Sequence, residues 1–216
     1  MSVLFLGITA ALLQILGYLT YGWKVLRRDI EPNATSWLMF AYGTSLLVLV
    51  EWDRDASFAL LALPAICAVL SVGIAIYCVR KARRLWWPAH PLERFSFALD
   101  VGLTLLYIIA WILVDKSLIT DAQKSLAEVL ILVCWNIGVF TAFFPLLRQV
   151  YHHPLTEHAI PWVIWTAAYT LLAYITYQEV GTFNELMLYP LTHVVVHGIV
   201  AVHTGRAHLK RNKIIL

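Results

Sequence analysis

Seven long apolar segments run along the chain, and short connections that hold most of the charged residues separate them. Each segment supplies the roughly 20 mainly apolar residues that a helix needs to cross a bilayer, although the second is short and needs part of its flanks. The pattern therefore predicts an all-α, polytopic membrane protein with seven transmembrane helices. The expected spans are Ser2–Trp23, Ser36–Val50, Ser57–Val79, Phe95–Val114, Leu126–Leu147, Ile160–Tyr177 and Glu185–His203.

The composition agrees with a chain that is embedded in lipid. Hydrophobic residues make up 61% of the 216 residues and charged residues 13%, with a mean hydropathy of +0.74. A soluble domain has about 25% charged residues, so this chain has more apolar surface than one globular core can bury. The first span lacks the basic start and the cleavage pattern of a signal peptide, so we expect it to stay in the membrane. Cys67, Cys78 and Cys134 all fall within expected spans, where they pack as small hydrophobic side chains.

Basic residues mark one side of the predicted membrane protein. All but three of the 16 Lys and Arg residues lie in the connections after the first, third and fifth spans or in the C-terminal tail. The exceptions, Arg54, Lys116 and Lys124, lie among acidic residues on the other side. Because cytoplasmic loops carry an excess of Lys and Arg, we expect the N-terminus outside and the C-terminus in the cytoplasm. Contact of these loops with anionic headgroups accounts for the net charge of +3.

A weak internal repeat relates the first three spans to the last three. One register pairs residues around spans two and six, and the same register with one inserted residue pairs residues in spans three and seven. The fourth span has no counterpart, and we expect it to be a linker that restores the orientation of the second copy. This predicts two parallel three-helix repeats in a 3+1+3 layout, with residues 1–84, the linker 85–124, and residues 125–216 with a basic tail. The matching pairs include Trp37 with Trp162, Val25 with Val150, Pro64 with Pro190, Ala75 with Ala201 and Arg80 with Arg206.

The twin segments YGWKVLRRDIEPNATSWLMFAYG and FPLLRQVYHHPLTEHAIPWVIW, together with the 3+1+3 layout, resemble the PQ-loop superfamily. That superfamily includes the SWEET sugar facilitators, cystinosin-like lysosomal transporters and KDEL receptors. The likeness covers nearly the whole chain, but the Pro-Gln pair is absent. Gln149 follows Pro145 only after Leu-Leu-Arg, and Thr20 occupies the matching position in the first copy. The resemblance implies a substrate cavity lined from spans three and seven.

Prolines inside the predicted helices are candidate hinges. A proline frees a backbone carbonyl and softens a membrane helix, which suits rocking between two states. Pro64 and Pro190 occupy matched interior positions, and Pro145 lies inside the fifth span. We assign a hinge role to these three. Pro161 lies at a helix start, where proline is ordinary.

A histidine pair in the sequence THVVVHG is the sharpest polar feature of the seventh span. His193 and His197 are four residues apart and therefore share one helix face. Ionisable residues at that depth usually face a cavity or other helices rather than lipid. They are candidates for hydrogen bonding a polar solute or for binding a proton near neutral pH. The structural alternative is a pair of neutral histidines that bond neighbouring helices. In the repeat they correspond to Cys67 and Ser71.

The spacing of the histidines does not predict a metal site. Two ligands are too few, and His152 and His153 belong to a cytoplasmic connection far from the helix centre. No third ligand is found at a matching depth, so no metal, haem or other cofactor is expected. The chain also has no glycine-rich phosphate loop, nucleophile elbow or paired intramembrane carboxylates. We therefore expect no enzymatic activity.

Further candidate binding residues come from spans two, five and six. Asn136 lies midway along the fifth span beside Trp135, where an amide either bridges helices or offers a donor and an acceptor to a solute. Four aromatic residues near the cytoplasmic ends of spans two and six either anchor the protein at the interface or flank a solute and close an inner gate. These four are Trp37, Phe40, Trp162 and Trp165. Trp86 and Trp87 follow a basic run and are expected at the lipid interface.

The acidic residues bear on the energy source. Asp100 begins the linker span near the cytoplasmic boundary, where we expect contact with headgroups or with a polar neighbour. No buried acidic residue is expected in spans two or six. This favours a facilitator over an acid-driven symporter, although the histidine pair leaves proton coupling open.

Two functions of different classes follow from these features. The first is a carrier that moves a small polar solute, such as a sugar, amino acid or vitamin, by alternating access around a midplane cavity. The second is a non-transporting receptor or scaffold of the KDEL-receptor type, which binds a peptide or partner protein in one leaflet-facing cavity. Its basic runs RKARR and LKRNK then act as docking or sorting signals. Fold alone does not choose between them. The expected partners are the solute and the lipid bilayer and not nucleic acid, and a homo-oligomer is left open.

Overall fold

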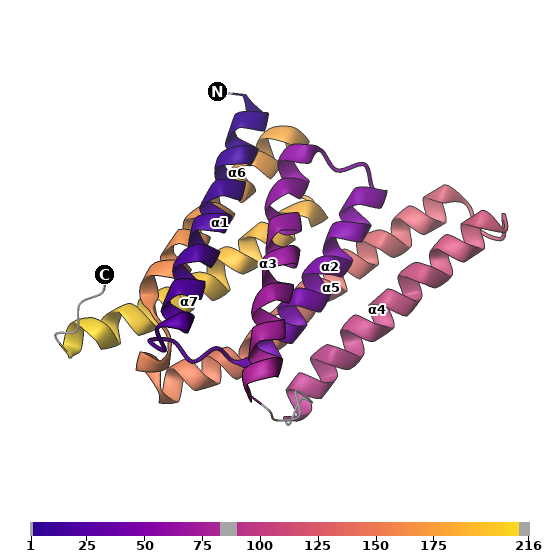
Figure 1. Cartoon of the computed structure of the whole chain (residues 1–216). Helices are drawn as coiled ribbons and strands as arrows, with labels where there is room; N and C mark the ends of the chain where they lie inside the picture. The colour runs from indigo at the N-terminus through magenta and orange to yellow at the C-terminus, as the bar shows by residue number, and fades with distance from the viewer. Residues whose placement is uncertain (1, 83–89, 212–216) are drawn as a thin grey trace.

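The computed structural model describes residues 2–82 and 90–211, and seven long α-helices fill most of these two ranges (Figure 1). All seven are long and apolar enough to cross a membrane. The chain is thus an all-helical protein of the polytopic membrane class, as the apolar segments predict. The helices are α1 (Val3–Leu26), α2 (Ala34–Asp53), α3 (Phe58–Ala82), α4 (Pro91–Asp115), α5 (Asp121–His152), α6 (Ala159–Val180) and α7 (Leu188–Lys210), with 3-10 turns η1 (Pro154–Thr156) and η2 (Glu185–Met187).

Polar side chains set several helix ends that hydropathy alone misplaces. Asn33 caps α2 by accepting the backbone N–H of Ser36 at 3.0 Å. Thr120 and Gln123 form a capping box, so α5 begins at Asp121 instead of at the first apolar residue. Each of these helices therefore starts in a polar segment that the sequence pattern assigns to a connection.

The helices pack in a defined order around the centre of the molecule. Helix α3 contacts both α1 and α2 and lies between them, while α7 contacts both α5 and α6 (Figure 1). Across the molecule, α1 packs against α6 and α2 packs against α5. Helix α4 packs mainly on α5 and more lightly on α2. Seen along the chain, the first three and the last three helices thus make the same set of contacts among themselves.

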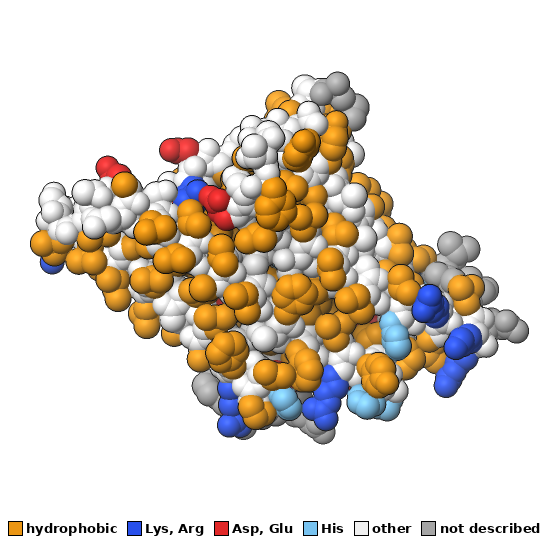
Figure 2. All heavy atoms as spheres, turned by 180° about the vertical axis from the view of Figure 1, so that it is seen from behind, with side chains coloured by type: hydrophobic (Ala, Val, Ile, Leu, Met, Phe, Trp, Pro, Cys, Tyr) orange, Lys and Arg blue, Asp and Glu red, His pale blue; other side chains and the backbone are white. Residues whose placement is uncertain are grey.

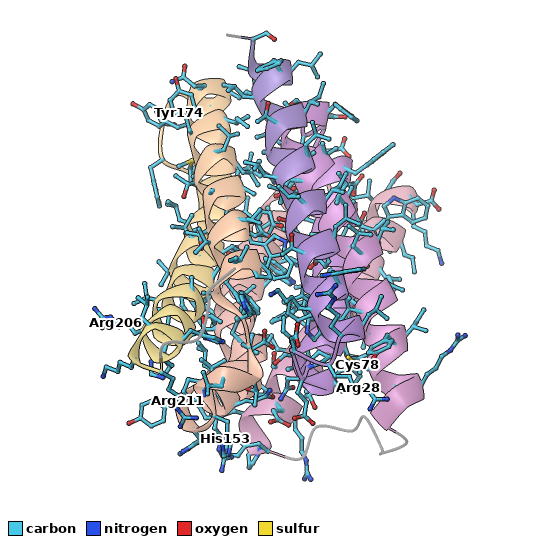
Figure 3. All side chains as sticks on the ribbon, turned by 60° about the vertical axis from the view of Figure 1, so that its left-hand side comes forward. Arg28, Cys78, His153, Tyr174, Arg206 and Arg211 are labelled. Carbon is cyan, nitrogen blue, oxygen red and sulfur yellow. The ribbon has the colours of Figure 1, made fainter. Side chains whose placement is uncertain are left out.

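The surface has an apolar middle and two charged ends. Hydrophobic side chains cover the middle of the face in Figure 2, most of the acidic side chains gather at its upper end, and most Lys, Arg and His side chains gather at its lower end. We name these the acidic end and the basic end. Arg28, His153 and Arg211 lie at the basic end, and Tyr174 lies toward the acidic end (Figure 3). This separation follows the charge pattern of the sequence, and the side of the membrane that each end faces stays a prediction.

The three candidate hinge prolines occupy two kinds of position. Pro64 lies inside α3 and Pro145 inside α5, as predicted. Pro190 is the third residue of α7 and follows the η2 turn, so the predicted interior position is wrong for this residue. A proline in the first turn removes no hydrogen bond from the helix, because the N–H groups there have no partner within it. The hinge roles stay predictions.

Some sequence features lie outside the described residues. One is the pair Trp86 and Trp87, which we expect at the lipid interface. The others are residues at the ends of the two basic runs, namely Arg83, Arg84 and Lys213.

Candidate binding site

A small cavity lies at the centre of the bundle, and side chains from all seven helices line it. Its volume is about 30 Å³, which is room for one or two water molecules. The helices are therefore closed around the cavity in this conformation. A solute the size of a sugar or an amino acid enters only if the helices move apart.

The histidine pair of α7 lies at this cavity. His193 and His197 are buried, line the cavity and have ring centroids 5.4 Å apart. The Nδ1 atom of His193 bonds the carbonyl of Tyr189 at 2.9 Å, and that of His197 bonds the carbonyl of His193 at 2.8 Å. Because a carbonyl only accepts, each Nδ1 carries the hydrogen and each Nε2 is left as an acceptor when the ring is neutral. The pair therefore offers two acceptor atoms, and its role in binding stays a prediction.

Aromatic rings form the part of the cavity wall that faces the basic end. Trp37, Trp162 and Trp165 are buried, with exposed fractions of 2%, 1% and 1%. The alternative that these residues anchor the protein at the lipid interface is therefore wrong. The ring centroids of Trp162 and Trp165 lie 5.0 Å apart, and Phe40 lines the same cavity with its centroid 4.4 Å from that of Phe143. These rings fill the space between α2, α5 and α6.

The amide predicted on α5 sits beside the cavity and does not line it. Asn136 is buried midway along α5, and its Nδ2 atom donates to the carbonyl of Leu132 on its own helix at 2.8 Å. Its Oδ1 atom is buried without a hydrogen-bond partner among the described residues. Its neighbour Trp135 lines the cavity, with its ring stacked 6.0 Å from that of His193. Of this predicted pair, the structure brings only Trp135 to the cavity.

Asp100 lies at the cavity and is buried, so the expected contact with headgroups is wrong. Helix α4 begins at Pro91, which places Asp100 well inside the helix instead of at its start. The buried residues of α4 include Ser96, Asp100 and Leu103, spaced as one helix face. Ser96 donates to the carbonyl of Gly138 on α5 at 3.3 Å, which holds this face against α5. Helix α4 thus places a carboxyl group at the centre of the bundle.

Several polar residues of the cavity were not predicted as binding residues. Tyr18 on α1 bonds Ser71 on α3, with 2.5 Å between the hydroxyl oxygens, and lies 3.3 Å from the sulfur of Cys67. The sequence repeat pairs Cys67 and Ser71 with the two histidines, which is a signal for both positions. For α1 the signal is weaker: Gln14, Tyr18 and Tyr21 form a stripe with polar atoms at helical spacing in an otherwise apolar segment.

The cavity is closed toward the basic end by a buried carboxyl group. Glu157, in the connection between α5 and α6, is fully buried and accepts hydrogen bonds from the Tyr21 hydroxyl at 3.0 Å and the Trp162 indole at 3.1 Å. Trp37 in turn donates to the Tyr21 oxygen at 3.1 Å. Burial raises the pKa of Glu157 from its ordinary 4.5 to about 8, against the opposing effect of the hydrogen bonds it accepts. These contacts join α1, α2 and α6 directly below the cavity.

His158 extends this cluster outward from Glu157. Its Nε2 atom lies 3.3 Å from the Nζ atom of Lys24, and its ring centroid lies 5.0 Å from that of His208 on α7. Burial, together with the charge of Lys24 and the neighbouring His208, lowers the pKa of His158 from 6.5 to about 4. The ring is therefore neutral at neutral pH and accepts from the lysine.

Ion pairs close the bundle at the acidic end. Arg54, which follows α2, bonds Glu185 of η2 at 2.6 Å and the backbone of Ser125 on α5 at 3.3 Å. Lys124 on α5 pairs with Asp53 at 2.5 Å. The expectation that span two holds no buried acidic residue is wrong, because α2 continues past Val50 and buries Glu51. Salt bridges thus join the end of α2 to the start of α5 and to the η2 turn.

The described residues contain no group of three or more His, Cys, Asp or Glu side chains placed to hold a metal ion. The polar atoms at the cavity are instead arranged to hydrogen-bond or to pair with a charge.

Comparison of the chain with protein-family models, with curated proteins and with solved structures finds no match. The family resemblance of the twin segments therefore stays a prediction.

Proposed function

We propose that this protein is a membrane carrier that moves a small polar solute by alternating access. The observation that carries the proposal is one central cavity to which all seven helices contribute and which is closed at both ends by separate sets of contacts. A carrier needs such a site, because the solute must reach it from one side at a time. In this interpretation the present conformation is the occluded state.

The helix packing supports a carrier built from two related halves. In the proposed repeat, α1, α2 and α3 correspond to α5, α6 and α7 in that order. The contact between α1 and α6 then corresponds to the contact between α5 and α2, and both contacts exist. Likewise, the contacts of α3 with α1 and α2 correspond to the contacts of α7 with α5 and α6. We therefore propose the 3+1+3 layout of two parallel repeats, with α4 as the linker. Repeats of this kind rock against each other in many transporters.

The two closures suit alternating access because they differ in chemistry and in position. At the acidic end, salt bridges connect α2 with α5 and η2, across the boundary between the two halves. At the basic end, Glu157 connects α1 with α6, again across that boundary. Opening one closure while the other holds would expose the cavity to one side. The charge pattern favours the basic end in the cytoplasm.

Solute uptake into proteoliposomes tests this function. The panel contains sugars, amino acids, vitamins and amines, and counterflow is measured for each. We expect accumulation of one chemical class and a loss of about tenfold or more when His193 or His197 is changed to Gln, which is the effect of one lost buried hydrogen bond of about 1.4 kcal/mol. His203→Gln is the matched control, because His203 lies on the same helix and stacks on Tyr151 away from the cavity. Folded protein that accumulates none of these solutes above empty liposomes contradicts the proposal.

A receptor is the second candidate, and one observation favours it. A hollow of about 300 Å³ at the basic end is lined by His152, His153 and Arg211, among others, and is far larger than the central cavity. In a receptor this hollow would take an acidic peptide. Removing the residues after Arg206 would then abolish binding of an acidic peptide probe, whereas transport would survive the same truncation.

A further inference from the structure

In the described part of the chain, the charged side chains that line the central cavity are acidic and not basic. Asp100 is the one acidic side chain among the described residues that line the cavity, and none of those lining residues is Lys or Arg. A carboxylate removed from water is costly unless a counter-charge or several donors accompany it. In the hydrogen bonds of the described residues, the Asp100 carboxylate receives no side-chain donor, and only its backbone carbonyl accepts, from Thr104 at 2.8 Å. The cavity therefore presents an unneutralised acid.

Two glycines keep this carboxyl group uncovered. A Cβ atom at Gly43 on α2 would lie 3.5 Å from the Oδ2 atom of Asp100, and one at Gly138 on α5 would lie 3.6 Å from its Oδ1 atom. The same Cβ at Gly43 would lie 2.8 Å from the Nε1 atom of Trp135. A side chain at either position would therefore be in van der Waals contact with the carboxyl group. The missing side chains leave its oxygens accessible from the cavity.

Most of the donors around the cavity already have partners within the protein. The indole N–H groups of Trp162 and Trp165 bond Glu157 and the backbone carbonyl of Gln14, at 3.1 Å and 3.3 Å. The hydroxyl of Tyr169 lies 3.1 Å from that of Tyr189. These groups are therefore not free to donate to a ligand.

Several acceptors of residues that line the cavity, in contrast, have no hydrogen-bond partner among the described residues. The Oε1 atom of Gln14 is buried and has no hydrogen-bond partner among the described residues. The Nε2 atoms of His193 and His197 accept when the rings are neutral, since each Nδ1 atom is bonded to a carbonyl. A ligand that matches this cavity brings hydrogen-bond donors and a positive charge.

Aromatic faces add to the preference for a cation. The rings of Trp37, Trp135, Trp165 and Tyr169 line the cavity together with the carboxyl group. A cation over the face of Trp or Tyr gains about 0.5–2 kcal/mol, and more when water is excluded. A carboxylate anion would instead meet the acid of Asp100 with no cation to hold it. A sugar would leave the acid without a counter-charge.

We propose that the central cavity binds a small organic ammonium cation, paired with Asp100 and enclosed by the aromatic rings. This substrate class deepens the proposed function and rests on it for transport, although binding itself can be tested separately. The closed cavity of about 30 Å³ is too small for such an ion together with its carbon chain. Binding therefore includes a widening of the bundle, and it changes the surroundings of the four tryptophans at the cavity.

Three probes of similar size and different charge test the substrate class. Propylammonium, 1-propanol and propionate are titrated into the detergent-purified full chain, and tryptophan fluorescence and calorimetry report binding. We expect propylammonium to bind at least tenfold more tightly than 1-propanol, and propionate not to bind. Equal binding of the ammonium ion and the alcohol overturns the proposal, and this comparison needs no variant.

The Asp100→Asn variant then tests the residue. It is expected to weaken propylammonium binding at least tenfold while leaving 1-propanol binding unchanged. Asp115→Asn is the matched control, because Asp115 ends the same helix and is exposed. Propylammonium binding that survives Asp100→Asn, or that falls equally in both variants, overturns the assignment.

Binding and uptake together separate this inference from the carrier proposal. Propylammonium that binds through Asp100 but never accumulates in proteoliposomes supports the substrate class and contradicts the carrier. Accumulation of a neutral sugar by protein that does not bind propylammonium overturns the substrate class and leaves the carrier in place.

Discussion

Glu157 is the buried carboxyl group whose surroundings are most fully defined. It has no exposed surface, yet it accepts hydrogen bonds from Tyr21 and Trp162 and from the backbone of His158. Burial favours the neutral acid, and the donors favour the carboxylate. Burial is the larger effect, and the pKa rises from 4.5 to about 8. When the basic end is closed, the Glu157 carboxyl group is therefore protonated near neutral pH.

This raised pKa predicts how stability depends on pH. The unfolded chain releases the proton of Glu157 near pH 4.5, whereas the folded chain keeps it up to about pH 8, so stability falls as the pH rises through this window. His158 has the opposite effect, because its lowered pKa of about 4 removes stability only as the pH falls below 6.5. Above about pH 6.5 His158 no longer changes the stability, and the part of the loss that Glu157 contributes between pH 6.5 and pH 8 is about 2 kcal/mol at most.

Thermal unfolding in detergent between pH 6.5 and pH 8 measures this loss. Glu157→Gln has a side chain of the same shape that does not titrate, so its unfolding temperature should decline less over this window than the wild-type value. Glu31→Gln serves as the control, because Glu31 is exposed. Parallel pH profiles for wild type and Glu157→Gln would show that this carboxyl group does not bind the proton.

Individual residues differ in how far the sequence reveals their place. His193 and His197 could be predicted to face inward, since two ionisable groups on one face of a membrane helix rarely meet lipid. Asp100 could not, because its depth depends on α4 starting at Pro91 under the cap of His90. Trp37 and Trp162 were matched by the repeat, but their burial depends on Tyr21 and Glu157, which come from other segments.

The contact between α1 and α3 shows what sets the spacing of these helices. A Cβ atom at Gly7 would lie 2.7 Å from the Cα atom and 2.8 Å from the carbonyl oxygen of Ala59. These are backbone atoms that cannot rotate away, so a larger residue would push α3 outward. Small residues allow this close approach between membrane helices.

Gly7→Ala is therefore expected to destabilise the protein by about 1–3 kcal/mol, the usual cost of overpacking. Gly22 lies on the same helix and has nothing within 4 Å of an added Cβ atom. Gly22→Ala should be neutral or stabilising by up to about 1 kcal/mol, because alanine favours the helix. Unfolding of both variants in detergent compares the two effects. Equal stability of the two variants would mean that α1 and α3 do not approach this closely.

Helices were easier to predict than their ends. An apolar run of about 20 residues has one stable solution in lipid, because the helix alone satisfies its backbone groups within the segment. The ends of α2 and α5 depend on pairs such as Lys124 with Asp53, whose members belong to different elements. Hydropathy assigns these charged residues to loops, although they lie within α2 and α5 and their ion pair closes the acidic end.

At the scale of the whole molecule, the two ends of the cavity are closed by contacts of unequal strength. The basic end is sealed by aromatic rings and an acid that are almost fully buried. The acidic end depends on Arg54, whose side chain is 17% exposed where it meets Glu185. Water weakens partly exposed ion pairs, so the acidic end should open at lower cost. Loss of Arg54 should therefore open the cavity at this end first.

Cys67 lines the cavity and reports such opening directly. In a chain whose other cysteines, Cys78 and Cys134, are changed to Ser, a small membrane-impermeant thiol reagent labels Cys67 only when the cavity opens. Arg54→Gln should raise the labelling rate from the acidic end by about tenfold to a hundredfold, since the lost charged hydrogen bonds contribute about 1.5–3 kcal/mol to the closed state. Lys116→Gln is the control, because Lys116 is an exposed cation in the connection that follows α4, at the same end. Equal labelling rates in both variants would mean that the ion pairs do not hold this end closed. Labelling that rises equally from both ends would mean that the closures open together, and the cavity would then behave as a channel and not as a carrier.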